Sequence, residues 1–316
     1  MTRPIASAPR TDSRERCTDP FDAYRGLLDA CRHGLVRDVS NSPCPDHVGR
    51  YVGSGKTLRP LILFMATSAV GGDPANAMCG AKAIELLHVA SLVHDDIIDG
   101  AVERRGMPAL HVQLGVERAL VIGDYLLLRA MTVLTQDTSC DSGTTVRVLG
   151  TLGAYAEQCC RGQVRELEPS AAGDREREYA AVAGWKTGAP FAAAASVGAI
   201  LGGGLDPEIE ALGEYGTRLG IAFQIEDDLR DLGDDARVGA ETPKGLASLP
   251  RHELAIETVR ATQASLVALA LDALDGLPKS GALDDLYLLP SRLLGCEASP
   301  VTRNARHDIL TRKSRG

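Results

Sequence analysis

Three aspartates end an apolar stretch of the chain, E-L-L-H-V-A-S-L-V-H-D-D-I-I-D at residues 85–99. On a helix, at about 100° per residue, Asp95 and Asp99 share a face with His88, and Asp96 lies at its shoulder. Carboxylates this close repel one another, and a helix C-terminus disfavours negative charge. A solvated helix end and a buried cation site both explain the pattern, and the apolar turns before it favour the cation. Oxygen ligands suit a hard ion such as Mg²⁺.

The same D-D-x-x-D spacing returns far downstream, in F-Q-I-E-D-D-L-R-D-L at residues 223–232. Gln224, Asp227 and Asp231 fall on one helical face about 60° wide, with Asp228 beside it. Two helices that face each other across a bundle can hold a small group of metal ions between their carboxylates. One such motif is modest evidence for a metal site, and two of them after apolar helices are much stronger evidence.

Basic residues accompany both motifs: Lys56 and Arg59 in G-S-G-K-T-L-R-P at 53–60, Arg104 and Arg105 after the first motif, and Lys186 in W-K-T-G. Any one of them alone is an ordinary surface charge. Together they suffice for two anionic groups, one held by metal ions with Arg104 and one gripped by Lys56, Arg59, His88 and Arg105. Arginine suits a two-pronged grip on diphosphate oxygens. G-S-G-K-T lacks the spacing and the preceding strand of a nucleotide phosphate loop.

Helix-period apolar spacing covers most of the chain and predicts helices around 21–39, 58–70, 75–99, 114–135, 143–167, 174–201, 207–232, 251–276 and 281–294. Clusters of Gly, Pro, Asp and Ser separate these segments. Only P-A-L-H-V-Q-L at 108–114 has the pattern of a strand. We therefore predict one all-α domain over residues 21–316, preceded by a disordered arm at 1–20 that has no signal-peptide core.

The composition limits the class of protein. The 316 residues are 44% hydrophobic and 24% charged, with a net charge of −8, which argues against a nucleic-acid binder. No run of eighteen apolar residues occurs, so we predict no membrane span. Eight cysteines are scattered without a C-x-x-C pair, which favours reduced thiols and a cytoplasmic location.

The chain resembles the trans-isoprenyl diphosphate synthases, the polyprenyl synthase family. The matching stretches are G-K-T-L-R-P, E-L-L-H-V-A-S-L-V-H-D-D-I-I-D, E-R-R-G-M-P, L-V-I-G-D-Y-L-L, R-G-Q, W-K-T-G-A-P-F and F-Q-I-E-D-D-L-R-D. They occur in the family's order and cover roughly residues 50–235. The resemblance implies an isoprenoid-synthase-type helical bundle around a central active-site cavity, usually in a homodimer.

The resemblance also implies a reaction and roles for single residues. The reaction is a Mg²⁺-dependent, head-to-tail (1′-4) condensation of isopentenyl diphosphate with an allylic diphosphate, with three ions when substrate is bound. The metal ligands would be Asp95, Asp96, Asp99, Asp227, Asp228 and Asp231, assisted by Arg104. Isopentenyl diphosphate would be bound by Lys56, Arg59, His88 and Arg105. The reacting centre would be lined by Lys186, Thr187 and Gln224.

Product length should depend on the residues before the first motif. Ala90 and Ser91 lie about one turn deeper than Asp95, where family members with fifteen-carbon products commonly carry an aromatic side chain. Both are small here, so Leu87 is the next candidate for the floor, and we expect geranylgeranyl diphosphate or a longer product. Ala90 and Ser91 can alternatively be positions of close helix packing, and a facing helix such as 114–135 can also close the cavity.

One stretch departs from the family pattern. The family usually shows G-K-x-x-G-x-D and then G-K-x-T-L-P after the second motif, whereas residues 233–250 here read G-D-D-A-R-V-G-A-E-T-P-K-G-L-A-S-L-P. Both expected lysines are missing, and Arg237 or Lys244 is the candidate substitute.

Two other functions stay open. A class I terpene cyclase shares the fold but not the second motif or the basic set. A non-catalytic subunit of a heteromeric prenyl synthase would explain the altered stretch but not the intact aspartates.

Overall fold

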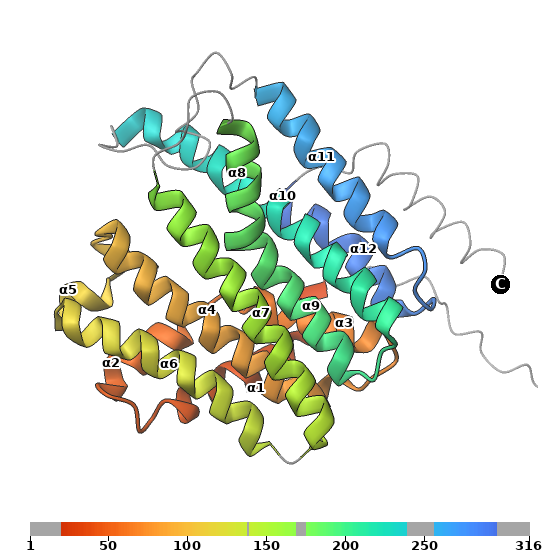
Figure 1. Ribbon diagram of the computed structural model, residues 1–316, viewed down its shortest axis with the longest axis horizontal. Coiled ribbons are helices and arrows are strands. Elements are labelled where there is room, and N and C mark those ends of the chain that lie inside the picture. The colour runs from red at the N-terminus through yellow and green to blue at the C-terminus, as the bar shows by residue number, and fades with distance from the viewer. Residues whose placement is uncertain (1–19, 138, 169–174, 239–255, 296–316) are drawn as a thin grey trace, which may run out of the picture.

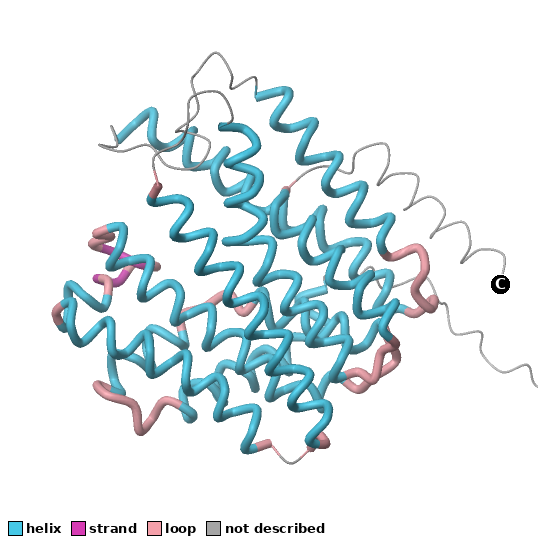
Figure 2. Tube along the Cα trace, viewed as in Figure 1, coloured by secondary structure: helices cyan, strands magenta, loops and turns pink. Residues whose placement is uncertain are grey.

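The computed structural model describes residues 20–137, 139–168, 175–238 and 256–295. Its helices are α1 (Pro20–Asp38), α2 (Pro45–Gly53), α3 (Leu58–Ala69), α4 (Met78–Asp99), α5 (Leu110–Leu114), α6 (Val116–Gln136), α7 (Ser142–Leu167), α8 (Arg175–Ala183), α9 (Ala189–Leu201), α10 (Asp206–Val238), α11 (Ile256–Ala273) and α12 (Gly281–Leu294). A short 3₁₀ turn, η1 (Pro74–Ala77), precedes α4, and a π-helical turn, η2 (Gly184–Gly188), joins α8 to α9. The predicted all-α class is confirmed (Figures 1 and 2).

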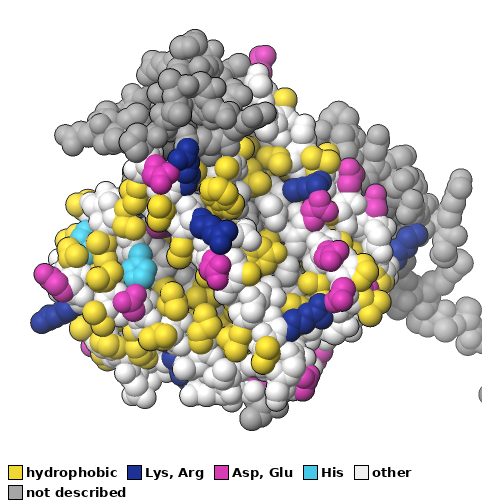
Figure 3. Space-filling view, in the orientation of Figure 1, with side chains coloured by type: hydrophobic (Ala, Val, Ile, Leu, Met, Phe, Trp, Pro, Cys, Tyr) yellow, Lys and Arg dark blue, Asp and Glu magenta, His cyan; other side chains and the backbone are white. Residues whose placement is uncertain are grey.

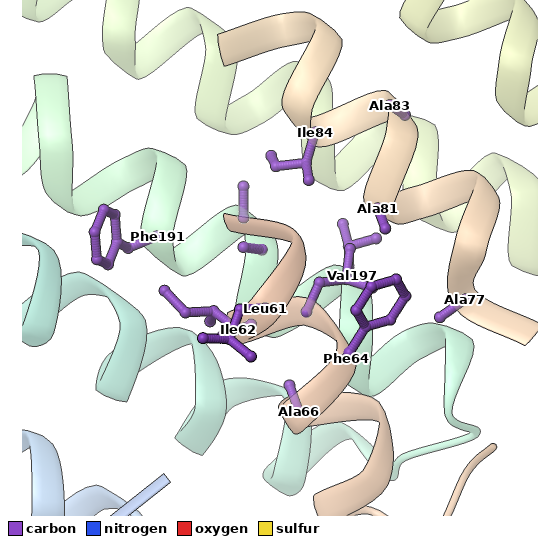
Figure 4. Close-up of a cluster of buried hydrophobic side chains, with 14 of the residues drawn as sticks. Leu61, Ile62, Phe64, Ala66, Ala77, Ala81, Ala83, Ile84, Phe191 and Val197 are labelled. Atoms are coloured by element: carbon purple, nitrogen blue, oxygen red, sulfur yellow. The ribbon is translucent and has the colours of Figure 1, made fainter. Parts of the chain in front are cut away.

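The bundle is built around α3 and α9, which are buried along most of their lengths. Every residue of α3 from Pro60 to Thr67 is buried, and every residue of α9 from Phe191 to Ile200 is buried. Small residues on α9 let the neighbouring backbones come close, so that Thr67 donates a hydrogen bond of 2.9 Å to the Gly198 carbonyl. Figure 4 shows Leu61, Ile62 and Phe64 of α3 beside Val197 of α9 and Ile84 of α4. This core fixes the helices that carry both acidic motifs.

The strand prediction for 108–114 is wrong. Residues 110–114 form the helix α5, and the strand pairing lies just before it, between β1 (Glu103–Arg104) and β2 (Met107–Pro108). The turn of this small hairpin is Arg105-Gly106, and both residues have positive φ, 54° and 75°. Such two-residue turns match the twist of paired strands, and Gly adopts them at no steric cost. The hairpin lies beside the end of α4 (Figure 2), and Arg104 donates a hydrogen bond to Asp96 of that helix.

Two further elements differ from the prediction. The helix α2 was missed because the segment 45–53 is short and follows a run of Ser, Asn and Pro that is typical of a loop. The predicted helix over 174–201 is interrupted at η2, which contains W-K-T-G. Pro190 explains the interruption, since proline has no N–H to donate to the carbonyl four residues earlier. A π-turn inside a helix widens it locally and is frequent at functional sites.

Several predictions fall on other parts of the chain. The predicted arm, apart from Pro20, and most of the divergent stretch at 233–250 lie outside the described residues, as does Lys244. The single-domain prediction for 21–316 stays a prediction, although one hydrophobic cluster extends from Tyr24 in α1 to Leu289 in α12. The cysteines of the described residues are free thiols, as predicted: Cys31, Cys44, Cys79, Cys140, Cys159 and Cys160.

Candidate active site

The first acidic motif occupies the C-terminal end of α4, which stops at Asp99 with Gly100 in the left-handed conformation. Asp95 is half-buried, and burial raises the pKa of its carboxyl above the usual value. The positive charge of Lys186 opposes this increase in pKa, while the carboxylates of Asp99 and Glu166 add to it. Asp95 is therefore a carboxylate that the fold does not neutralise by itself, and a bound cation would stabilise its charged form.

Asp96 has a different environment from Asp95. Its side chain is 1% exposed and accepts a hydrogen bond of 2.8 Å from Nε of Arg104. The hydroxyl of Tyr51, on α2, donates to its second oxygen. Both oxygens are engaged by protein donors, and through them the carboxylate ties α2 and the hairpin to α4.

The second acidic motif lies on α10 and repeats this division. Burial raises the pKa of Asp227, Arg230 and Lys56 lower it, and Asp231 and Asp228 raise it. Asp228 instead accepts hydrogen bonds of 2.6 Å from the Gln224 amide and 2.8 Å from the Tyr179 hydroxyl. In each motif burial raises the pKa of the first aspartate, and Asp227 also pairs with Arg230 at 3.7 Å, whereas the second aspartate is hydrogen-bonded to a tyrosine from another helix.

A close helix crossing sets the position of the second motif. A Cβ at Gly220 of α10 would lie 2.7 Å from the Thr187 carbonyl oxygen, so only glycine allows the two backbones to approach this closely. One turn further along α10, the Thr187 hydroxyl donates a hydrogen bond of 2.6 Å to the Gln224 side chain. The Gln224 amide in turn donates a hydrogen bond to Asp228. The predicted residues Thr187 and Gln224 therefore meet in one network.

Lys186 connects the site to α7. Its ammonium donates a hydrogen bond of 2.6 Å to Glu166 near the end of that helix, and its charge also acts on Asp95. Lys56 acts in the same way on Asp227 from the loop before α3. Each first aspartate thus has a lysine from another element whose charge lowers its pKa, Lys186 of η2 for Asp95 and Lys56 for Asp227.

The basic residues gather at the N-terminal end of α3 and the facing side of α4. The Arg59 guanidinium lies 5.4 Å from the ring centre of Phe191, and its Nε is buried without a hydrogen-bond partner among the described residues. Burial lowers the pKa of His88 well below its usual value, and the nearby charges of Arg59, Arg105 and Arg104 lower it further. His88 is therefore neutral at pH 7, and its ring can donate one N–H to an anion.

The three predicted chain-length residues occupy different environments. Ser91 is exposed, and its hydroxyl donates a hydrogen bond to the His88 carbonyl, while Leu87 is half-buried. Ala90 is only 2% exposed and belongs to the hydrophobic core. Ser91 thus lies on the face of the acidic motif, and Ala90 packs behind it.

The residues present fit a divalent metal ion. Within the part of the chain that the structure describes, no three His, Cys, Asp or Glu side chains are close enough to hold an ion by themselves. Asp95 and Asp227 nevertheless share the features that a hard cation requires, namely oxygen donors, partial burial and a carboxylate neighbour that raises the pKa. A magnesium ion bound by few protein oxygens commonly completes its coordination with water and substrate phosphate.

Several residues of the site had no role in the sequence prediction. Glu85 had a readable signal, because it is a charge inside an apolar helix three residues before His88. Glu166 follows R-G-Q by three residues, and its contact with Lys186 depends on the π-turn. Tyr51 and Tyr179 gave no signal, since only the tertiary fold brings them to the aspartates.

One helix passes a simple test for a membrane span. By length and composition α6 is apolar enough to cross a bilayer, and 39% of its most apolar window is buried in the structure. Core helices of a bundle pass the same test, and α6 packs on α4 with Ile122 and Leu126 buried. The predicted absence of a membrane span stays a prediction.

The arrangement defines a class of protein: an α-helical bundle that carries one aspartate motif on α4, another on α10, and basic residues at the start of α3 and in the hairpin. The polyprenyl synthetase family model matches residues 45–246, and the chain belongs to that family. A short chain isoprenyl diphosphate synthase of Methanothermobacter thermautotrophicus is 39% identical over 204 residues, which is 62% of this chain and 61% of the relative.

Two further similarities agree with this family. A geranylgeranyl diphosphate synthase of Sulfolobus acidocaldarius is 34% identical over 239 residues, 75% of this chain and 72% of the relative. The solved structure of a geranylgeranyl pyrophosphate synthetase from Geoglobus acetivorans superimposes with a TM-score of 0.74 at 26% identity, covering 86% of this chain and 99% of that one. The isoprenoid-synthase-type fold is thereby confirmed.

Proposed function

We propose that the protein is a trans-prenyltransferase that condenses isopentenyl diphosphate head-to-tail with an allylic diphosphate. The observation that carries the proposal is the presence of partly buried aspartates with raised pKa on two helices, Asp95 on α4 and Asp227 on α10, together with the buried and unpartnered Nε of Arg59. The aspartates suit a diphosphate bound through metal ions, and the Arg59 guanidinium suits a diphosphate bound directly. Two binding modes for diphosphate fit a reaction between two diphosphate esters.

The metal-binding residues of this proposal are carboxylates of the two motifs. Asp95, Asp99, Asp227 and Asp231 would hold Mg²⁺, with three ions when substrate is present, and the bound ions would supply Lewis-acid stabilisation of the leaving diphosphate. Asp96 and Asp228, also predicted as ligands, act by holding Arg104 and Gln224 in place.

The chain's own residues bind and orient the reactants. Lys56, Arg59, Arg105 and the neutral His88 bind the diphosphate of isopentenyl diphosphate, while Arg104 and Lys186 attract the allylic diphosphate. The bond between the allylic carbon and its diphosphate oxygen breaks, and the double bond of isopentenyl diphosphate attacks that carbon. The new carbocation loses a proton to the released diphosphate. Thr187 and Gln224 keep Asp228 and the adjacent wall of the site in register.

The product is expected to have twenty carbons or more. Ser91 is small and exposed on the face of the first motif, and Leu87 lies one turn deeper. A side chain of this size at Ser91 does not block a growing chain at that depth. Residues deeper in the bundle, on α4 or a facing helix, then set the limit.

The test is an incubation of the purified protein with Mg²⁺, isopentenyl diphosphate and allylic primers of five, ten and fifteen carbons, followed by measurement of product chain length. Linear prenyl diphosphates that consume isopentenyl diphosphate are the expected result. A cyclic hydrocarbon from the allylic substrate alone would identify a class I cyclase. No turnover with any primer would favour a non-catalytic subunit of a heteromeric synthase.

We also propose a homodimer that forms through α6 and α7. Figure 3 shows hydrophobic side chains gathered over these helices, and the exposed ones include Val121 and Leu128 on α6 and Val164 on α7. A folded monomer seldom exposes so many large apolar residues on adjacent helices. Leu128→Glu should convert the dimer to a monomer in light scattering, whereas Leu205→Glu, equally exposed at another position, should not. A monomeric wild-type protein would contradict the proposed homodimer.

We also propose that the protein is cytoplasmic.

A further inference from the structure

Glu85 is a buried carboxylate that the proposed reaction does not use. It lies on α4 between Ile84 and Leu86, and its side chain is 1% exposed. Its Oε2 has no hydrogen-bond partner among the described residues. Leaving a buried carboxylate oxygen without a partner is costly, so such a group needs an explanation.

Three arginines from separate elements surround Glu85. Arg59 of α3, Arg105 of the hairpin and Arg32 of α1 all attract its charge. The loop before α3 lies against the same point, since a Cβ at Gly55 would be 2.5 Å from Oε1 of Glu85 and 3.2 Å from Nη1 of Arg105. Only glycine at position 55 lets the carboxylate and this guanidinium approach the loop so closely.

The loop itself has a fixed and unusual shape. Thr57 is 2% exposed and has a φ of 52°, a conformation that β-branched residues rarely adopt. Arg32 reaches its hydroxyl at 3.5 Å. Strained backbone of this kind persists where the surroundings hold it, and it is common at ligand sites. Glu85, Arg105 and Arg32 are the charged groups that surround this loop.

A comparison with Glu226 shows that Glu85 is not a stabilising carboxylate of the usual kind. Glu226 on α10 is also buried, at 6% exposure, but it pairs with Arg260 and accepts a 3.1 Å hydrogen bond from Gln263. Glu85 forms no such contact with any described residue, and burial raises the pKa of its carboxyl even though Arg59, Arg105 and Arg32 lower it. The charge of Glu85 therefore costs stability, whereas that of Glu226 contributes to it.

We infer that Glu85 is a positioning residue of the isopentenyl diphosphate subsite, where its charge holds Arg59 and Arg105 side by side against the loop at 53–57. Two guanidinium groups next to each other repel, and a carboxylate between them offsets that repulsion before the diphosphate arrives. The pocket is then ordered in advance, so binding does not have to order it. This inference rests on the proposed function, because that function assigns the subsite to Arg59 and Arg105.

The test compares Glu85→Gln with the matched variant Glu226→Gln. Glu85→Gln should raise the KM for isopentenyl diphosphate about tenfold, the change that roughly 1.4 kcal/mol of binding produces. Its kcat and its KM for the allylic primer should stay within about twofold, and its melting temperature should be equal to or above the wild-type value. Glu226→Gln should lower the melting temperature and leave both KM values unchanged. Gly55→Ala, which pushes a methyl group into Oε1 of Glu85, should raise the same KM as Glu85→Gln.

Two results would overturn the inference: an unchanged KM for isopentenyl diphosphate in Glu85→Gln, or an equal increase in KM for both substrates. A wild-type protein that does not condense the two substrates would instead refute the proposed function. In that case calorimetry with inorganic diphosphate still tests Glu85. Weaker binding by Glu85→Gln than by wild type would support the positioning role, and equal binding would refute it.

Discussion

Asp95 and Asp96 are adjacent in the sequence, yet the structure predicts opposite effects of replacing them with asparagine. Asp96 is buried and accepts hydrogen bonds from Arg104 and Tyr51. Asp95 is half-buried, and its pKa is raised by burial and by nearby carboxylates. Asp96→Asn should therefore lower stability and spare Mg²⁺ binding, while Asp95→Asn should spare stability and weaken Mg²⁺ binding.

The magnitude for Asp96→Asn follows from its contacts. Removing one partner of a buried charged pair costs about 3–5 kcal/mol. The Arg104 side chain is 33% exposed, so water recovers part of this loss. The asparagine oxygen also still accepts one hydrogen bond, which leaves an expected loss of about 2 kcal/mol in the free energy of unfolding. For a chain of this size that corresponds to a melting temperature lower by roughly 4 °C.

The assay has two parts for each variant. Thermal unfolding with EDTA present reports stability without metal ions. Titration of activity with Mg²⁺ at fixed substrate concentrations reports the half-saturating concentration of the ion. Asp95→Asn should raise that concentration about tenfold or more, the effect of losing about 1.4 kcal/mol of interaction. Its melting temperature should equal or exceed that of the wild type, because a poorly neutralised charge is removed.

One result would refute this reasoning. If Asp96→Asn raised the half-saturating Mg²⁺ concentration as much as Asp95→Asn does, with an unchanged melting temperature, then Asp96 would be a metal ligand. Tyr51→Phe provides an independent control, since it keeps the Asp96 charge and removes only one hydrogen bond. It should lower stability by about 1.5 kcal/mol and leave the Mg²⁺ dependence unchanged.

His88 has a depressed pKa, so the unfolded chain gains a proton below about pH 6.5 that the folded chain does not. Stability should therefore fall as the pH drops through that value. Urea unfolding at pH 7.5 and 5.5 should show a smaller loss of unfolding free energy for His88→Gln than for the wild type. An equal loss in the two proteins would contradict the burial of a neutral ring. Ser91→Phe should shorten the products, whereas Ala90→Phe, at a core position, should mainly lower the free energy of unfolding by about 1–3 kcal/mol. Product analysis and denaturation separate the two, and the reverse pattern would place the product path behind α4. Tyr179→Phe removes the 2.8 Å hydrogen bond to Asp228 and should lower kcat about tenfold in steady-state kinetics; an unchanged kcat would show that Asp228 is held without it.

The helical faces that carry the acidic residues could be predicted from the sequence because these residues lie on long, strongly periodic helices. The 3.6-residue period fixes which side chains share a face, so placing His88 with Asp95 required no tertiary information. The same holds for Gln224 and Asp227 on α10. The fold class followed from the same periodicity, which occupies most of the chain.

The remaining features could not be predicted because they depend on contacts between distant segments. Nothing near Asp96 in the sequence indicates Tyr51, which lies 45 residues earlier on α2. The strand was predicted too late in the chain, at 108–114, because P-A-L-H-V-Q-L alternates like a strand, whereas the observed pairing joins 103–104 to 107–108 across the turn at Arg105-Gly106. Pro190 explains the π-turn at η2, but it did not predict it, because proline is common in the first turn of an ordinary α-helix.

The two aspartate motifs give their adjacent carboxylates different surroundings. In a helix, consecutive residues point about 100° apart, so the two carboxylates of a D-D pair meet different neighbours. The fold resolves this by giving the second aspartate of each pair to a tyrosine and one further donor: Tyr51 with Arg104, and Tyr179 with Gln224. These second carboxylates accept hydrogen bonds from the protein, whereas burial raises the pKa of Asp95, Asp227 and Glu85. A fold selected for stability alone would not keep the pKa of three buried carboxylates raised, so these carboxylates mark where a cation or a cationic side chain has to be held ready for substrate.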